Sequence, residues 1–404
     1  MPVKPLAGIT VFETDSFVAG PSSCLALSQL GAEVVKIDPI KGGPDIDRWP
    51  ITASGESIYW RTLNRNKRSV AINLRDPEGQ ELAQALITSP GEKSGIFVEN
   101  NVGREYLSDK VLRAKRGDLI HVKVQGSADG GPGVDYTVNA SSGIPLITGP
   151  STNDGPVNHA LPAWDLLCGQ AAVTAVTTGL FHRATTGEGL YEEIALKDIA
   201  LSAVANLGWY TEALQPSGER TKHGNHIFGS LGQDFATQDG RHVMVTAITK
   251  RQWQNLVTST GLCEVIAALE TNLGTDFAEE TNRYTYREVI VSLLKPWFEK
   301  RTADQIRSEL KGSGVLWAPY ETTGEVAQAA IDKAGPEVVR SMESETLGTM
   351  LVGAQPIRVN GEYLPEGSET VFGSETEAVL TEKLGLNATE LGRLFDAGII
   401  AKGR

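Results

Sequence analysis

Basic side chains are concentrated in one short stretch of the sequence, between positions 61 and 75. Arg61, Arg65, Lys67, Arg68 and Arg75 form the densest basic cluster in the chain. Because guanidinium groups match the oxygen geometry of phosphates, this cluster favours a small polyanionic ligand. A solvated, charged surface is the alternative, and the sequence alone leaves both open.

One carboxylate stands where a loop is predicted to meet a helix. Asp165 follows Pro-Ala-Trp at 162–164 and precedes the small, apolar stretch 168–184, which is predicted to be a buried helix. The amide groups and the dipole at a helix N-terminus favour a negative charge, so we expect Asp165 to be ionised. The residues alone favour a helix N-cap at this position.

The motifs of the commonest α/β chemistries are absent. The sequence contains no GxGxxG, no Gly-Lys dipeptide, no Gly-x-Ser-x-Gly, and no histidine followed by glutamate. Dinucleotide, Walker-type, serine-hydrolase and zinc-protease sites are therefore not predicted. The three cysteines, Cys24, Cys168 and Cys263, are too scattered for disulfides or a metal site, which favours a reducing, cytoplasmic compartment.

Composition limits the partners of the chain. The 404 residues include 37 Lys and Arg against 50 Asp and Glu, giving a formal net charge of −13. Such a charge disfavours binding to nucleic acid or to a membrane surface. The hydrophobic fraction of 40% is sufficient for a sizeable core, and no apolar run is long enough to cross a membrane.

Strands and helices alternate along the first part of the chain. Strands are predicted at 8–13, 33–37, 69–74, 95–99 and 119–124, with helices at 21–30, 76–87 and 108–116 between them. This order predicts a parallel sheet with right-handed crossovers. The Gly- and Ser-rich stretch 126–155 is predicted to be a loop, followed after the 168–184 helix by a strand at 191–196 and a helix at 197–214.

The composition changes beyond residue 215, which indicates a second domain. We therefore expect an α/β fold, with a Rossmann-like parallel-sheet large domain formed by 1–215 and 335–404. A smaller α+β domain is expected at 225–330, after a linker at 216–224. The helical tail at 375–400 is expected to pack against the large domain.

Five segments, in this order, resemble the class III CoA-transferases of the CaiB/BaiF type. They are PLAGITVFETDSFVAGPSSCLALSQLGAEVVKIDPIKGGPDIDRW, NRNKRSVAINLRDPEGQEL, IFVENN, TGEGLYEEIALKD and HGNHIFGSLGQDFATQDGR. The resemblance implies an enzyme that uses coenzyme A as part of its substrate, with no permanently bound cofactor or metal. It also implies an interlocked homodimer.

The resemblance implies that Asp165 is the nucleophile. It would attack the thioester carbonyl, form a mixed anhydride and then carry CoA as an aspartyl thioester. Because an anhydride hydrolyses readily, the site must exclude water, and Gly224, Gly229 and Gly232 are candidates for a lid with oxyanion donors. Ordinary turns are the alternative for these glycines.

The same resemblance implies a set of CoA-binding residues. Arg75 and Arg104 are the candidates for the phosphates. The full set is Val18, Ala19, Ile72, Asn73, Leu74, Arg75, Asn100, Arg104, Asp135 and Tyr136.

Two departures from the family pattern narrow the reaction. Val134 stands where a racemase of this family has its histidine base, and Val18 replaces the glutamine of the formyl-CoA transferases. Racemisation and the use of oxalate are therefore disfavoured.

The stretches VNHALPAWD and VLWAPYET are most similar to members that move CoA between the C1 and C4 carboxyls of mesaconyl-CoA, a C5 unsaturated dicarboxylate. Candidates for holding its distal carboxylate are Arg48, His159, Gly224 and His226. The alternatives are an intermolecular dicarboxylate CoA-transferase and a non-catalytic nucleotide-binding protein.

Overall fold

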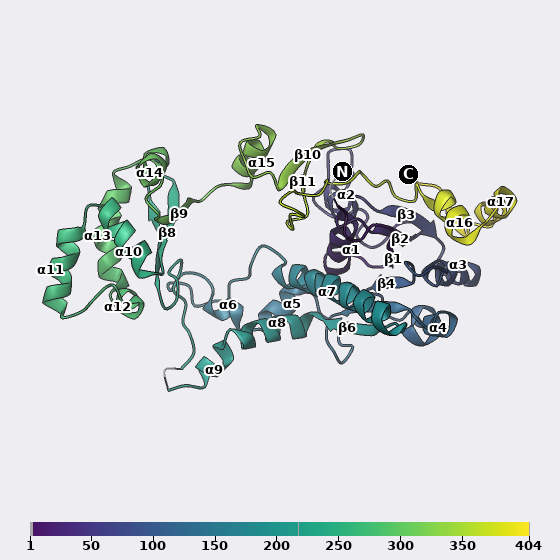
Figure 1. Ribbon diagram of the computed structural model, residues 1–404, viewed down its shortest axis with the longest axis horizontal. Helices are drawn as coiled ribbons and strands as arrows, with labels where there is room; N and C mark the ends of the chain where they lie inside the picture. The colour runs from purple at the N-terminus through teal and green to yellow at the C-terminus, as the bar shows by residue number, and fades with distance from the viewer. Residues whose placement is uncertain (1–2, 217, 404) are drawn as a thin grey trace. The chain divides into compact units, whose positions relative to one another are not determined.

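The computed structural model describes residues 3–216 and 218–403. Six parallel strands form the main sheet, which confirms the predicted large parallel-sheet domain. They are β1 (Thr10–Glu13), β2 (Glu33–Pro39), β3 (Arg68–Ile72), β4 (Ile96–Glu99), β5 (Ile120–Gln125) and β6 (Tyr191–Ala195). The last strand, β12 (Ile400–Ala401), pairs antiparallel with β3 and completes the order β12-β3-β2-β1-β4-β5-β6. Figure 1 shows β3, β2, β1 and β4 side by side in this order.

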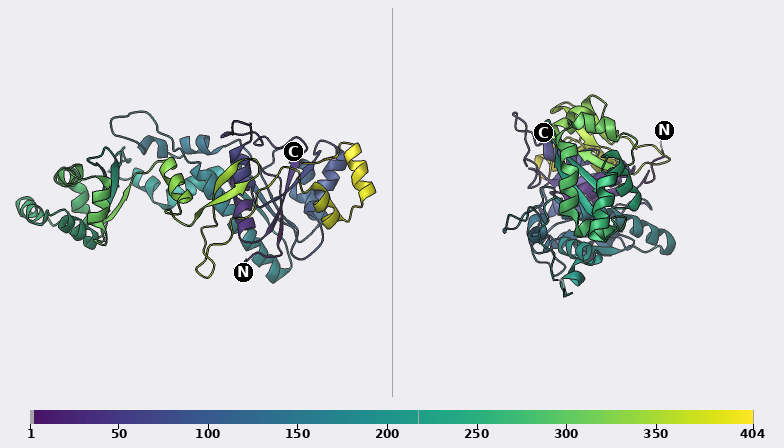
Figure 2. Two further views of the ribbon diagram at one scale, coloured as in Figure 1. Left: turned by 90° about the horizontal axis from the view of Figure 1, so that it is seen from above. Right: turned by 90° about the vertical axis from the view of Figure 1, so that its left-hand side faces the viewer.

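Helices cover both faces of this sheet (Figure 2). On one face α1 (Ala19–Gln29) packs against α7 (Ala163–Thr186). On the other face lie α3 (Pro77–Ile87), α4 (Asp109–Lys115), α16 (Thr376–Leu384) and α17 (Ala388–Asp396), which share one core with the strands. Because both faces are covered, the central strands β1 to β4 are almost entirely buried.

Glycine allows α1 and α7 to approach closely. A Cβ atom on Gly169 of α7 would lie 2.3 Å from Ser22 Oγ and 2.9 Å from the carbonyl oxygen of Ala19. Any larger residue at 169 would therefore push the two helices apart. The start of α1 and the start of α7 are thus fixed next to each other.

Two stretches depart from their predicted structure. The predicted loop 126–155 contains α5 (Asp135–Ala140) and α6 (Ile144–Ile147), and the predicted helix 197–214 is divided into α8 (Leu196–Asn206) and α9 (Trp209–Ala213). The short, polar α5 has weak intrinsic propensity and is held by α7 and α8. Gly208, with a φ of +77°, ends α8 in the left-handed conformation that glycine adopts freely.

The chain divides into two units. The first contains the described residues of Met1–Ser142, His159–Glu212 and Ala327–Arg404, and the second contains Gly143–Asn158 and Ala213–Val326. The segment 143–158 therefore differs from our expectation, because it belongs to the second unit. Of the predicted linker 216–224, Ser217 lies outside the described residues.

The second unit has its own sheet and core. Strands β7 (Leu231–Ala236), β8 (His242–Ala247) and β9 (Leu316–Pro319) pair antiparallel. Four helices complete the core with them: α10 (Lys250–Ser259), α11 (Cys263–Leu273), α13 (Arg287–Glu299) and α14 (Ala303–Leu310). A further helix, α12 (Glu280–Thr285), packs against β7 and α13. Phe235 and Phe298 stack at its centre, with ring centroids 4.4 Å apart.

The remaining elements lead into and out of these cores. They are α2 (Ile58–Asn64), η1 (Glu105–Leu107), α15 (Thr323–Ile331) and the hairpin of β10 (Val339–Ser344) and β11 (Gly348–Gly353). The C-terminal helices α16 and α17 pack on the first unit, as predicted. No helix within the described residues is long and apolar enough to cross a membrane.

Candidate active site

The predicted binding residues follow the carboxyl ends of parallel strands, at one edge of the sheet. Ligands of open α/β sheets bind at this edge. Val18 and Ala19 follow β1, and Arg48 follows β2. Asn73 to Arg75 follow β3, Asn100 and Arg104 follow β4, and Asp135 and Tyr136 follow β5.

Asp165 lies in the first turn of α7 and is half-buried. It does not cap the helix. Asp135 takes that role, because its Oδ2 accepts the backbone N–H groups of Trp164 at 2.8 Å and Asp165 at 3.1 Å. The Asp165 carboxylate makes no hydrogen bond to the described residues, so it is not needed to hold the helix.

The charge on Asp165 differs from our expectation. Burial, and secondly the negative charge of Asp135, raise the pKa of Asp165 to about 6, while Arg48 lowers it. The expected stabilisation by helix amides fails because Asp135 already occupies those amides and repels a second carboxylate. Asp165 is therefore a poorly stabilised anion at neutral pH, which suits a nucleophile.

His159 is also part of this group. Its Nε2 lies 2.6 Å from Asp135 Oδ1, and its ring lies near Tyr136 and Trp164. Tyr136 is 43% exposed, and its hydroxyl donates to the Ala160 carbonyl at 3.2 Å.

Arg48 stands over two aromatic rings beside the site. Its guanidinium lies 5.2 Å from the Phe17 centroid and 5.3 Å from the Tyr59 centroid. The Tyr59 hydroxyl is buried and has no hydrogen-bond partner among the described residues. Burial raises the pKa of Tyr59 to about 12, and Asp165 contributes to that rise. Sequence reasoning missed Tyr59, because an aromatic residue within SIYW is typical of a core helix.

The loops after β1 and β4 hold each other. Asn100 Nδ2 donates to the Ser16 carbonyl at 2.8 Å, and Ser16 N–H donates to Asn100 Oδ1 at 3.1 Å. Val18 and Ala19 begin α1 directly after this pair. Asn100 therefore positions the α1 N-terminus through its side chain.

The loop after β3 is joined to the C-terminal strand region. Asn73 N–H donates to the Ile399 carbonyl at 2.7 Å, and Ile72 pairs with Ile400. Leu74 is buried, whereas Arg75 is exposed and makes no ion pair with a described residue. Arg104 directly precedes η1. Of the two predicted phosphate ligands, Arg75 is thus free to bind an anion.

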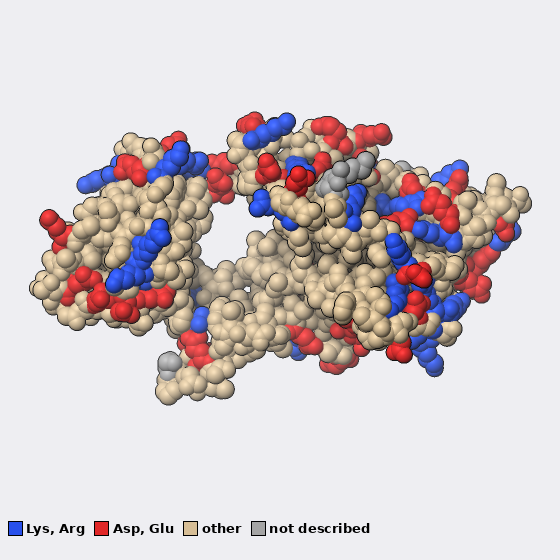
Figure 3. Space-filling view, in the orientation of Figure 1, with Lys and Arg blue, Asp and Glu red and all other residues tan. Residues whose placement is uncertain are grey.

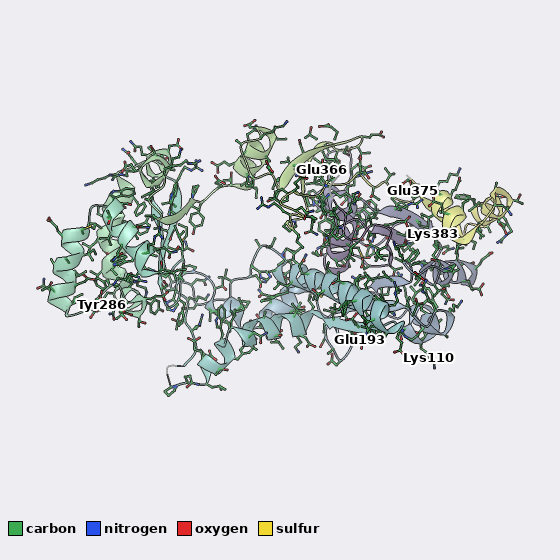
Figure 4. All side chains as sticks on the ribbon, viewed as in Figure 1. Lys110, Glu193, Tyr286, Glu366, Glu375 and Lys383 are labelled. Atoms are coloured by element: carbon green, nitrogen blue, oxygen red, sulfur yellow. The ribbon has the colours of Figure 1, made fainter. Side chains whose placement is uncertain are left out.

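The basic cluster is mostly structural, which corrects the interpretation of 61–75 as an anion site. Arg61 pairs with Glu56 and Glu369, Lys67 with Glu13, and Arg68 with Glu33, Glu375 and Glu382. Arg65 is buried and donates to backbone carbonyls. Figure 4 labels Glu375, one of these partners, near α16 together with Lys383. Only Arg75 of the five remains available.

A buried charged cluster lies beneath the β1–α1 loop. Glu13, Asp15 and Cys24 offer ligand-type atoms within 4.8 Å of one another. However, the ammonium groups of Lys67 and Lys36 lie 2.9 and 3.1 Å from Glu13 Oε1. Although burial opposes them, these two charges keep the pKa of Glu13 below its usual value. The lysines therefore supply the positive charge that a metal would bring.

The second unit carries the other predicted site residues. Gly224 has a φ of +62° and donates its N–H to the Gly149 carbonyl at 3.0 Å. His226 Nε2 lies 3.5 Å from Glu288 Oε1, and its Nδ1 is buried without a partner among the described residues. Both Gly224 and His226 belong to the second unit.

The first unit is therefore an α/β fold with a half-buried aspartate, Asp165, near the edge of the sheet where ligands of such folds bind. The chain belongs to CoA-transferase family III, whose family model matches residues 6–366. This confirms the family resemblance.

The chain is 41% identical to the 2-methylfumaryl-CoA isomerase of Chloroflexus aurantiacus, over 98% of both chains. It is 28% identical to the human succinyl-CoA:glutarate CoA-transferase, over 98% of this chain and 90% of that protein. A CaiB/BaiF family protein from Brucella suis superposes with a TM-score of 0.76 at 25% identity, covering 94% of this chain and 99% of that one.

Proposed function

We propose that this protein moves CoA between the C1 and C4 carboxyls of mesaconyl-CoA, which is 2-methylfumaryl-CoA, within one substrate molecule. The observation that carries this proposal is the 41% identity, along 98% of both chains, to an isomerase of that compound. The half-buried Asp165, whose pKa is about 6, supports the chemistry, since a carboxylate has to be the acceptor of the acyl group.

The reaction proceeds through Asp165. One carboxylate oxygen attacks the C1 thioester carbonyl and expels CoA thiolate, which leaves a mixed anhydride. The thiolate attacks the Asp165 carbonyl carbon, giving an aspartyl-CoA thioester and free mesaconate. The C4 carboxylate then attacks that thioester and releases the thiolate, which finally attacks the C4 carbonyl and frees Asp165.

Retention of the free acid decides whether transfer stays within one molecule. A bound mesaconate re-attacks at a high effective concentration, whereas a released one is replaced by another acid. We propose Arg48 as its anion partner, because it is the cation that lowers the pKa of Asp165. Gly224 and His226 remain proposals for the same role.

For the CoA moiety, we propose the residues around the carboxyl edge of the sheet. Arg75 and Arg104 would contact phosphates, and Val18, Ala19, Ile72, Asn73, Leu74, Asn100, Asp135 and Tyr136 would line the remainder. We propose no permanently bound cofactor or metal and a cytoplasmic location.

We also propose an interlocked homodimer. The outward side of α7 carries the exposed Leu167 and Phe181, and uncharged surface dominates around α5, α7 and α8 in Figure 3. Light scattering after size exclusion should give twice the mass of one chain. A monomeric mass would contradict the proposal.

The second candidate is intermolecular transfer between dicarboxylates. It is favoured by the relative named succinyl-CoA:glutarate CoA-transferase, which matches along 98% of this chain. A conversion that requires added succinate or another dicarboxylate would support it.

The test is to incubate the purified protein with C1-mesaconyl-CoA alone and to separate the regioisomers by chromatography. We expect the C4 isomer to form without any added acid. Asp165→Ala should abolish conversion and hydroxylamine trapping at residue 165, while Asp396→Asn, an exposed aspartate on α17, should retain both. No C4 isomer from the wild type would refute the isomerase.

A further inference from the structure

The imidazole of His159 is fixed six residues before Asp165. Its Nε2 donates to Asp135 Oδ1 at 2.6 Å. The ring centroid lies 6.0 Å from that of Tyr136 on α5 and 6.1 Å from that of Trp164 on α7. One ring nitrogen is therefore committed to a protein carboxylate rather than to a ligand.

Asp135 carries the contact onward to the backbone of α7. This carboxylate is only 2% exposed, and its second oxygen accepts the N–H groups of Trp164 and Asp165. A continuous path of hydrogen bonds therefore runs from His159 Nε2, through one buried carboxylate, to the backbone nitrogen of Asp165.

Helix α5 also holds the segment between His159 and Asp165 at two other points. The Tyr136 hydroxyl donates to the Ala160 carbonyl, and Trp164 Nε1 donates to Asn139 Oδ1 at 3.0 Å. These contacts fix the segment but leave the rotation of the Asp135 carboxylate undetermined. Among the described residues, only His159 makes a hydrogen bond with Asp135 Oδ1.

We propose that His159 is a positioning residue. By holding Asp135 Oδ1, it keeps Asp135 Oδ2 on the backbone N–H groups in the first turn of α7 and so aligns the Asp165 carboxylate. This rests on the proposed nucleophilic role of Asp165. This positioning role differs from the role expected from the sequence, in which His159 would bind the distal carboxylate of the substrate. A buried hydrogen bond to a charged group is strong enough to define one orientation.

Two amide variants separate these roles. The amide nitrogen of Gln reaches as far as His Nε2, whereas that of Asn does not. We expect His159→Asn to lower kcat at least tenfold with KM changed less than twofold, and His159→Gln to retain at least half of wild-type kcat. His182→Gln, the same change near the other end of α7, is the matched control and should leave both constants unchanged.

Hydrogen exchange of the Trp164 and Asp165 amides tests the alignment without substrate. These amides should exchange at least tenfold faster in His159→Asn than in the wild type, and at the wild-type rate in His159→Gln. Unchanged exchange in His159→Asn would overturn the proposal, even if the wild type does not isomerise mesaconyl-CoA. A loss confined to KM would also overturn it, in favour of substrate binding by His159, as would a tenfold loss of kcat in His159→Gln.

Discussion

At the scale of single residues, Asp165 is balanced between two opposing charges. Burial raises its pKa most, Asp135 raises it further and Arg48 lowers it, which leaves the pKa at about 6. The nucleophilic form is the carboxylate. We therefore expect kcat to fall as the pH drops through about 6, with Asp165 as the group that gains the proton.

Replacing Arg48 tests this balance. In Arg48→Gln the charge that lowers the pKa of Asp165 is gone, so the acid limb of the kcat–pH profile should move to higher pH. Loss of a charge-assisted hydrogen bond to the free carboxylate should also lower kcat/KM by about 10–100-fold. Arg48→Lys keeps the charge and should keep the limb. An unmoved limb in Arg48→Gln would show that Arg48 does not act on Asp165.

The same raised pKa has a cost in stability. Above pH 6 Asp165 is ionised in both the folded and the unfolded state. Ionisation costs more free energy in the folded state, because the pKa of Asp165 is about 6 there and near 3.8 in the unfolded chain. Asp165→Asn should therefore stabilise the fold by about 1–3 kcal/mol at pH 8. The gain should disappear as the pH falls from 6 towards 4. Thermal melting at pH 8 and pH 4 measures it, and an equal effect at both would argue against a titrating Asp165.

At the scale of elements, two glycines in helices should respond in opposite directions to the same substitution. Gly169→Ala places a Cβ against Ser22 and the Ala19 carbonyl, so it should destabilise the protein by about 1–3 kcal/mol. Gly392 in α17 has open space around it, and Gly392→Ala should stabilise the protein by about 0.5–1 kcal/mol. Chemical denaturation measures both. Similar effects of the two changes would contradict the close approach of α1 and α7.

The elements also show which parts could be predicted from sequence. The first strands were predictable because they are buried apolar runs and because Asp76 and Pro77 mark the start of α3. The partners of Arg68 were not, since Glu375 and Glu382 lie about three hundred residues away in sequence. Similarly, nothing local indicated that Asp135 caps the helix of Asp165, because only the fold brings α5 to the start of α7.

At the scale of the whole molecule, the first unit depends on residues at both ends of the chain. A chain ending at Ser374 lacks α16, α17 and β12, which contribute Val379, Leu380, Leu391, Leu394 and Ile400 to the main core. At about 1.5–3 kcal/mol for each buried side chain, this loss equals the stability of a typical domain. We expect such a chain to aggregate on expression, whereas a chain ending at Ala401 should melt cooperatively. A soluble, cooperatively melting chain ending at Ser374 would contradict this dependence.

The pairing of β12 with β3 also affects how the protein is made. Residues 68–72 leave the ribosome more than three hundred residues before their edge partner at 400–401. Until then the apolar face of β3 and α3 is uncovered, while the second unit, encoded in between, can fold around its own core. The nascent chain therefore presents an unfinished sheet until α16, α17 and β12 are made, and exposed sheet of this kind is prone to aggregation and is bound by chaperones.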